Sequence, residues 1–135
     1  MYLLDTNVLA ELRKGERCEE KVRLWAASTT GDRHFISVLS LGEIRKGIGI
    51  LRRKAPDQCP AFEGWLCHIQ TEYDRDILPV TAAFSERWGT LMAAQSLPVI
   101  DSLLAATALE FMLTVVTRNT TDFAPTGVPL LNPFD

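Results

Sequence analysis

Four acidic side chains of this chain could carry chemistry together: Asp5, Glu43, Asp101 and Asp122. Asp5 ends an apolar run and precedes a helical pattern, Asp101 opens a second helical pattern, and Asp122 follows a β-branched run. Glu43 falls on the inward side of a predicted helix, where an unpaired carboxylate would cost several kcal/mol. Clustered carboxylates raise one another's pKa unless a cation lies between them. The acids therefore suggest a cation site.

Mg²⁺ or Mn²⁺ would suit such a cluster, because hard divalent ions prefer oxygen ligands. A metal of this kind can lower the pKa of a bound water, orient it and stabilise charge on a phosphodiester, so the expected chemistry is phosphodiester hydrolysis. Neutral groups that could hold a water or a carboxylate in place lie nearby in the sequence: Thr6, Asn7, Thr117 and Asn119.

Each acid also has a purely structural explanation. Asp5 and Asp122 could cap helices or close turns, and Asp101 could simply favour a helix N-terminus through the helix dipole. The stretch Ser40–Glu43 fits a capping box, in which Glu43 would bond the backbone of Ser40. If the helix instead starts at Ser37, Glu43 lies in its second turn and capping is excluded.

The basic residues allow two interpretations. The net charge of -3 is not typical of a nucleic-acid-binding protein. Two clusters could nevertheless bind phosphates beside the acids or could form solvated helix faces: Arg13, Lys14, Arg17 and Lys21, and Arg45, Lys46, Arg52, Arg53 and Lys54. Arg118, in the predicted exit loop 118–123, is the strongest candidate for a phosphate contact.

Strand-like and helix-like segments alternate along the chain. Short apolar or β-branched runs predict strands at 2–4, 34–38, 77–80, 114–117 and 128–131, with 77–80 at an edge because Pro79 cannot donate a ladder hydrogen bond. Periodic apolar residues predict helices at 8–15, 19–27, about 37 or 40 to 54, about 61–73, 81–92 and 100–112, the last one buried, with 56–60 as a loop. This alternation predicts a parallel sheet layered between helices, with all strand exits on one edge.

Three glycines lie inside the predicted helix that carries Glu43: Gly42, Gly47 and Gly49. Glycine inside a helix costs up to about 1 kcal/mol relative to alanine. We therefore expect another element to approach this helix closely.

The length of the chain favours a single domain over residues 1–135. Its cysteine content favours a reducing compartment. No apolar run reaches the roughly 20 residues that a membrane span needs, and the first residues lack the pattern of an export signal, so we expect a cytoplasmic protein. Cys18, Cys59 and Cys67 lack zinc-site spacing and are expected to be thiols. His34 and His68 have no catalytic partner in the sequence.

Four segments together resemble the signature motifs of PIN-domain ribonucleases, specifically the VapC-type toxins of toxin–antitoxin pairs. They are Leu3–Leu9, Leu41–Ile44, Asp101–Ala108 and Thr117–Phe123. The resemblance covers the whole chain and implies an α/β fold of three layers, α/β/α, with a central parallel sheet of about five strands and the first strand in the middle. It also implies homodimers and inhibition by a small antitoxin. One departure is the segment Leu109–Leu113, which lacks the small turn residue often found there.

The resemblance further implies Mg²⁺- or Mn²⁺-dependent cleavage of RNA. Metal binding would belong to Asp5 and Asp101, Glu43 and Asp122 would complete the acidic pocket, and Thr117 and Asn119 would support it. The main alternative is a catalytically silent module that binds RNA or protein through the same crevice. A phosphotransfer enzyme with Asp5 as nucleophile ranks last, because Asn7 stands where a second acid is expected.

Overall fold

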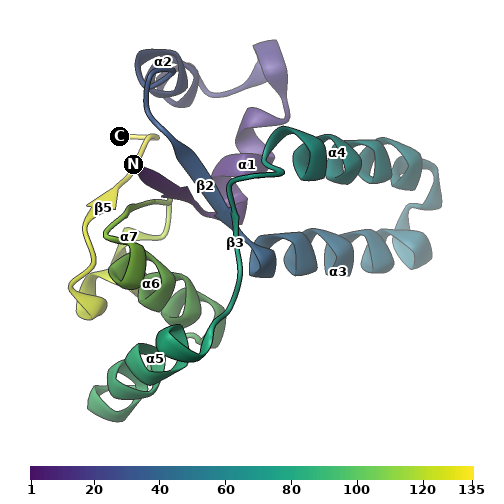
Figure 1. Ribbon diagram of the computed structural model, residues 1–135. Helices are drawn as coiled ribbons and strands as arrows, with labels where there is room; N and C mark the ends of the chain where they lie inside the picture. The colour runs from purple at the N-terminus through teal and green to yellow at the C-terminus, as the bar shows by residue number, and fades with distance from the viewer.

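The apolar run at the N-terminus forms the central strand of a parallel sheet. In the computed structural model, which describes residues 1–135, the strand order is β3-β2-β1-β4-β5 (Figure 1). All neighbouring strands pair in parallel, as predicted. The strands are β1 (Tyr2–Leu4), β2 (His34–Ser37), β3 (Ile77–Leu78), β4 (Thr114–Val116) and β5 (Leu130–Leu131). The predicted edge strand is confirmed as β3, but it is shorter than the segment 77–80, since Pro79 and Val80 lie outside it.

Alternate residues of the inner strands enter two separate cores. Leu4, Ile36 and Val116 belong to one buried cluster, whereas Leu3, Phe35 and Val115 belong to the other. Side chains alternate between the faces of a strand, so both faces of this sheet are covered. The predicted three-layer α/β/α architecture is confirmed.

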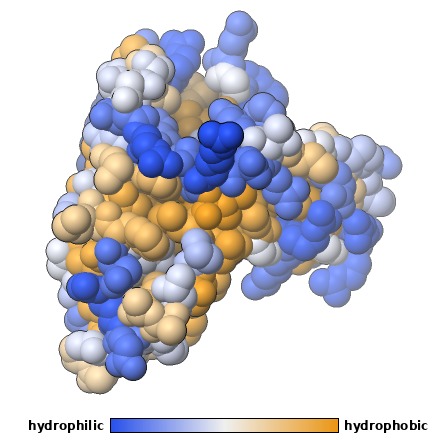
Figure 2. All heavy atoms as spheres, in the orientation of Figure 1, coloured by the Kyte–Doolittle hydropathy of each residue, from blue (hydrophilic) through white to orange (hydrophobic).

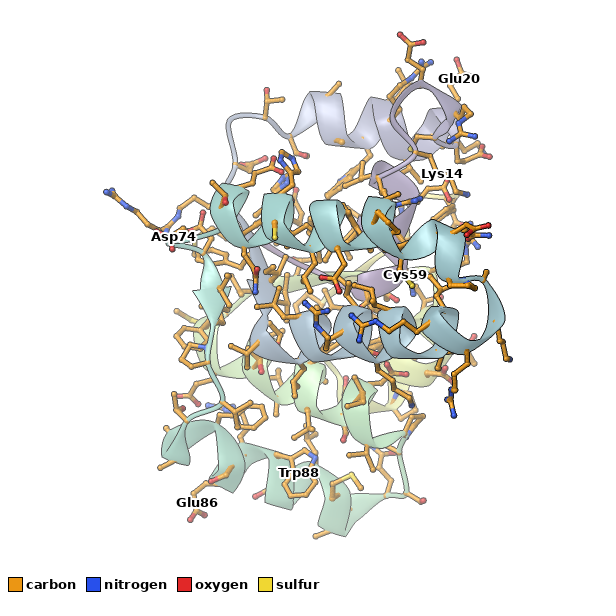
Figure 3. All side chains as sticks on the ribbon, turned by 90° about the vertical axis from the view of Figure 1, so that its right-hand side faces the viewer. Lys14, Glu20, Cys59, Asp74, Glu86 and Trp88 are labelled. Carbon is orange, nitrogen blue, oxygen red and sulfur yellow. The ribbon has the colours of Figure 1, made fainter.

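The first cluster lies under the helices of the N-terminal half. It includes Val8 of α1 (Thr6–Leu12), Ile44 of α3 (Val38–Lys54) and Ile69 of α4 (Cys59–Glu72), with α2 (Glu20–Ser28) adding Trp25 at its margin. Helices α3 and α4 form a hairpin that extends away from the sheet (Figures 1 and 3).

The second cluster lies under the helices of the C-terminal half. Leu104 comes from α6 (Val99–Phe111), Phe123 from α7 (Thr120–Phe123), and Leu91 of α5 (Ala82–Ala94) packs at the margin. The expected inward face of α5 is confirmed, because its buried or half-buried large side chains are Phe84, Trp88, Leu91 and Met92. Helix α6 is buried in its middle but not throughout, since Val99 and Phe111 at its ends are exposed.

Several predicted boundaries were wrong. The first helix is Thr6–Leu12, not 8–15, because Asp5 caps it. The predicted loop at 56–60 is a short 3-10 helix, Pro56–Gln58, followed at once by α4, in whose first turn Pro60 is tolerated. The predicted exit loop 118–123 contains α7, and β5 is shorter than the segment 128–131. Further 3-10 turns span Gly15–Arg17 and Ala124–Thr126.

The expectation of a close neighbour over the glycines of α3 was also wrong within this chain. A Cβ atom added at Gly42, Gly47 or Gly49 would meet no atom within 4 Å. No element of the fold therefore explains these glycines.

The remaining expectations from composition have the following outcomes. No helix combines the length and the apolarity required for a membrane span. All three cysteines are free, Cys18 and Cys59 being buried and Cys67 exposed. His34 stacks on Trp25 with ring centroids 5.3 Å apart, and exposed His68 lies 2.9 Å from Glu72.

Candidate active site

Asp5 lies at the carboxyl end of the central strand and is 5% exposed. Its Oδ1 accepts the backbone N–H of Thr6 at 2.7 Å, so it caps α1, while its Oδ2 accepts the hydroxyl of Thr117 at 2.8 Å and the amide of Asn7 at 3.2 Å. Burial raises the pKa of the Asp5 carboxyl, and these three hydrogen bonds oppose the shift. The helix cap uses only one carboxylate oxygen, Oδ1. The capping role of Asp5 therefore does not exclude a further role of its carboxylate in a site.

Thr117 connects the end of β4 to Asp5. It is fully buried, and its Oγ1 accepts hydrogen bonds from the Asn7 amide at 3.3 Å and the Asn119 backbone N–H at 3.0 Å. Asn7 in turn accepts the backbone N–H of Arg118 at 3.2 Å. The segment after β4 is therefore tied to the start of α1.

Glu43 reaches the same region from α3. The N-cap of α3 is Ser37, whose hydroxyl accepts the N–H of Leu39 at 3.0 Å, so the capping box of Ser40 and Glu43 is excluded. Glu43 instead accepts the hydroxyl of Thr6 at 2.7 Å. Its pKa is raised, first by burial and further by the charge of Asp5, against the lowering effects of Thr6 and Lys46.

Asp101 lies in the first turn of α6 and makes no side-chain hydrogen bond or ion pair. Burial raises its pKa to about 6, with the charges of Asp5, Asp122 and Glu43 contributing in that order. These effects show that acids from four distant parts of the sequence lie within electrostatic range of one another.

The remaining predicted residues lie at the margin of this group. Asp122 is exposed in α7, and its backbone N–H bonds the carbonyl of Asn119. Asn119 is exposed and contributes its backbone N–H to Thr117 rather than its side chain. The guanidinium of exposed Arg118 lies 3.7 Å from the ring centroid of Phe134, near the C-terminus.

A divalent cation fits these residues through a limited number of direct ligands. The donors are all oxygens, and buried Asp5 has no cationic partner, which leaves a negative charge for a cation to neutralise. No three His, Cys, Asp or Glu side chains stand close enough to chelate one ion together. A divalent ion bound here would therefore have at most two of these side chains as direct ligands, and Mg²⁺ can be held by one or two carboxylates with waters in its other positions.

Two of the five basic side chains of α3 are engaged within the chain. Arg45 and Arg52 both pair with Glu63 of α4, at 2.6 and 3.0 Å, between the two helices seen in Figure 3. Arg13 lies 4.0 Å from the ring centroid of Phe62. Lys46, in contrast, is exposed and without an ion pair, one helical turn beyond Glu43.

A groove of about 460 Å³ lies between α3 and the start of α6, and Glu43 is the one acid of the four that lines it. Its lining includes Glu43, Lys46, Gly42, Gly47 and Ile100. Figure 2 shows apolar side chains gathered over the adjacent β3 and the start of α3, where Val38 and Val80 are exposed. A larger cavity of about 680 Å³ lies elsewhere, between α2 and α4, and contains none of the four acids.

The PIN domain model matches residues 2–127, nearly the whole chain. The chain belongs to the PIN domain family. All four acids of the candidate site lie within the matched range, as do Thr117 and Asn119. The match covers four of the five strands, β1 to β4, and ends before β5.

Named relatives of this PIN domain include toxins. It is 28% identical to Toxin FitB of Neisseria gonorrhoeae over 145 residues, covering 99% of both chains. It is 26% identical to VapC ribonuclease Y4jK of Sinorhizobium fredii over 150 residues, covering 100% of this chain and 99% of that protein. The crystal structure of FitAcB from Neisseria gonorrhoeae superposes with a TM-score of 0.87 at 26% identity, covering 99% of both chains.

Proposed function

We propose that this PIN domain is an Mg²⁺- or Mn²⁺-dependent endoribonuclease that acts as the toxin of a toxin–antitoxin pair. The observation that carries the proposal is Asp5, a buried carboxylate at the end of the central strand with Glu43, Asp101 and Asp122 in electrostatic range and no cationic partner. The ribonuclease name of one relative and the toxin name of another support the substrate class and the role.

The residues of the site would have different roles. Asp5 and Asp101 would hold the metal, with Glu43 and Asp122 as further anionic groups that bind its waters. Thr117 and Asn7 keep Asp5 in place, and Thr6 keeps Glu43 in place, through the hydrogen bonds described above. When bound, the metal would activate a water and stabilise negative charge on the phosphodiester.

Phosphate contacts would come from the cationic residues at the margin. Lys46 has no ion pair and lies beside Glu43, so it is available for a phosphate. Arg118 would have to leave the ring of Phe134, a contact worth about 0.5–1 kcal/mol at an exposed site. Such contacts make RNA affinity fall with salt.

The direct test is RNA cleavage by Asp5→Asn. Asparagine is also a good N-cap, so the variant should fold. With Mn²⁺ present, cleavage should fall about 100-fold or more, because a charged ligand is lost. Asp74→Asn is the matched control, since Asp74 is an exposed turn residue without a side-chain partner, and it should cleave as the unchanged protein does. Sequencing of the RNA ends would identify the cleavage site.

The spacing of the acids is also compatible with one alternative function. Because no three of them converge, the chain could be a catalytically silent module that binds RNA or protein through this crevice. The same variant separates the two functions: a binding module would lose little function in Asp5→Asn. Antitoxin-free protein that cuts no RNA with Mg²⁺ or Mn²⁺ would contradict the ribonuclease.

The proposed partners are a small antitoxin and a second copy of the chain. One similar structure is a toxin–antitoxin complex from Klebsiella pneumoniae, at 25% identity and a TM-score of 0.71. Co-purification with the product of a neighbouring small gene would test the antitoxin. The cytoplasmic location stays a prediction, for which cell fractionation is the measurement.

A further inference from the structure

The outer helix α5 contacts the first turn of α6 through one polar side chain. The indole N–H of Trp88 donates to the hydroxyl of Ser102 at 2.9 Å, and that hydroxyl donates to the carbonyl of Val99 at 2.6 Å. Ser102 is fully buried and follows Asp101 directly. In Figure 3 the ring of Trp88 lies between α5 and the helix above it, α6.

This contact adds a directed hydrogen bond to the apolar packing of Ile100 and Leu104 at the start of α6. Pro98, the N-cap residue, makes no side-chain cap, and Asp101 itself makes no hydrogen bond. Asp5 differs, since three donors hold its carboxylate. The position of the Asp101 carboxylate is therefore set by the position of the α6 backbone.

The neighbouring charges act against that position. Asp5, Asp122 and Glu43 all repel an ionised Asp101. Without a restraint, the first turn of α6 would move away from Asp5 in the metal-free protein. The hydrogen bonds from Trp88 to Ser102 and from Ser102 to Val99 oppose this movement, because they fasten the turn to α5.

We propose that Trp88 is a positioning residue that, through Ser102, holds the first turn of α6 and with it Asp101 in the position from which Asp101 binds a divalent cation together with Asp5. The inference rests on the proposed function, because it assigns a cation to these acids. Trp88 does not touch the cation or the substrate in this arrangement. Its effect is on affinity for the ion.

The experiment measures Mn²⁺ binding to the full-length protein by the electron paramagnetic resonance signal of free Mn²⁺. Trp88→Phe keeps an aromatic ring and removes the N–H, and Ser102→Ala removes the acceptor with minimal change in volume. Both should raise the Kd for Mn²⁺ by about 3- to 10-fold, somewhat less than the loss of a residue that contacts a ligand directly. The Kd of the double variant for Mn²⁺ should not exceed the higher of the two single-variant Kd values, because both changes break the same chain of hydrogen bonds.

Arg87→Met is the matched control. Arg87 precedes Trp88 on α5 and pairs with Glu110 at the other end of α6, at 3.1 Å. This variant loosens the same pair of helices, so its melting temperature should fall, but its Kd for Mn²⁺ should stay within twofold of the unchanged protein.

Two results would overturn the inference. In the first, Trp88→Phe and Ser102→Ala both bind Mn²⁺ as tightly as the unchanged protein. In the second, Arg87→Met weakens Mn²⁺ binding as much as Trp88→Phe and Ser102→Ala do. Unchanged protein that binds no Mn²⁺ is a different outcome, because it would overturn the proposed function itself. If Trp88→Phe does not fold, Ser102→Ala decides between these outcomes.

Discussion

At the scale of single residues, the four acids differ in how they are held. Asp5 and Glu43 accept hydrogen bonds, whereas Asp101 has none and carries a pKa raised to about 6. A carboxylate in this state is costly to ionise in the absence of a cation. The ionised site therefore lowers the stability of the metal-free protein, and a bound divalent ion would relieve this cost.

This cost predicts how stability depends on pH. Between its ordinary pKa of 3.8 and its folded value of about 6, Asp101 keeps its proton in the folded protein but loses it in the unfolded chain. In EDTA, the free energy of unfolding should therefore rise as the pH falls from about 7 to about 5. Asp101→Asn should show a shallower rise and, near pH 7, a gain of about 1 kcal/mol, since solvent screens this half-exposed group.

Urea denaturation of both proteins at several pH values measures this effect. Asp5 and Glu43, whose pKa values are also raised, should leave part of the slope in the variant. Equal slopes in the two proteins would mean that Asp101 is not strained by its neighbours.

At the scale of elements, the connection between α6 and β4 shows a local conflict. Met112 ends α6 with φ of 54°, in the left-handed region that favours glycine, and its side chain is 88% exposed. The sequence lacks the small residue expected in this turn. The helix nevertheless ends there because Leu113 is buried and its N–H bonds the carbonyl of Ala108 at 2.8 Å.

Met112→Gly should therefore stabilise the protein. Relief of the left-handed strain should add about 1 kcal/mol to the free energy of unfolding, reduced by the extra freedom of glycine in the unfolded chain. Met112→Ala serves as the control, because it removes the same side chain and keeps the strain. Chemical denaturation in EDTA would compare the two, and equal stabilities would contradict the role of backbone strain.

At the scale of the whole molecule, the glycines of α3 bear on assembly. Gly42 and Gly47 line the groove beside the acids, and open space lies over both. If this face stays free, Gly47→Ala should stabilise the chain by up to about 1 kcal/mol, as helix propensity dictates. If the proposed second copy covers it, the added methyl should weaken the dimer.

Sedimentation equilibrium and denaturation of Gly47→Ala distinguish these outcomes. Gly49→Ala is the matched control, because Gly49 also has open space around it but does not line the groove. We expect Gly49→Ala to be stabilised without a change in association, whereas Gly47→Ala should dissociate more readily if the second copy covers the groove. Equal association of both variants would place the dimer contact on another face.

The sequence by itself determined the order of strands and helices and the set of acids to consider. Strands in a parallel sheet all exit at one edge, so Asp5 and the segment after β4 were expected at the same edge once the alternation was recognised. Local patterns were sufficient for this, because strand and helix periodicity and helix caps depend on residues near one another in the chain.

Only the tertiary structure decided which partners these residues have. The hydroxyl of Thr6 holds Glu43, the ring of Phe134 lies under Arg118, and Trp88 reaches the turn that carries Asp101. No local pattern encodes these contacts, because they join segments whose separation is fixed by how the helices pack on the sheet. The same packing left the α3 glycines open, although their cost had suggested a neighbour within the chain.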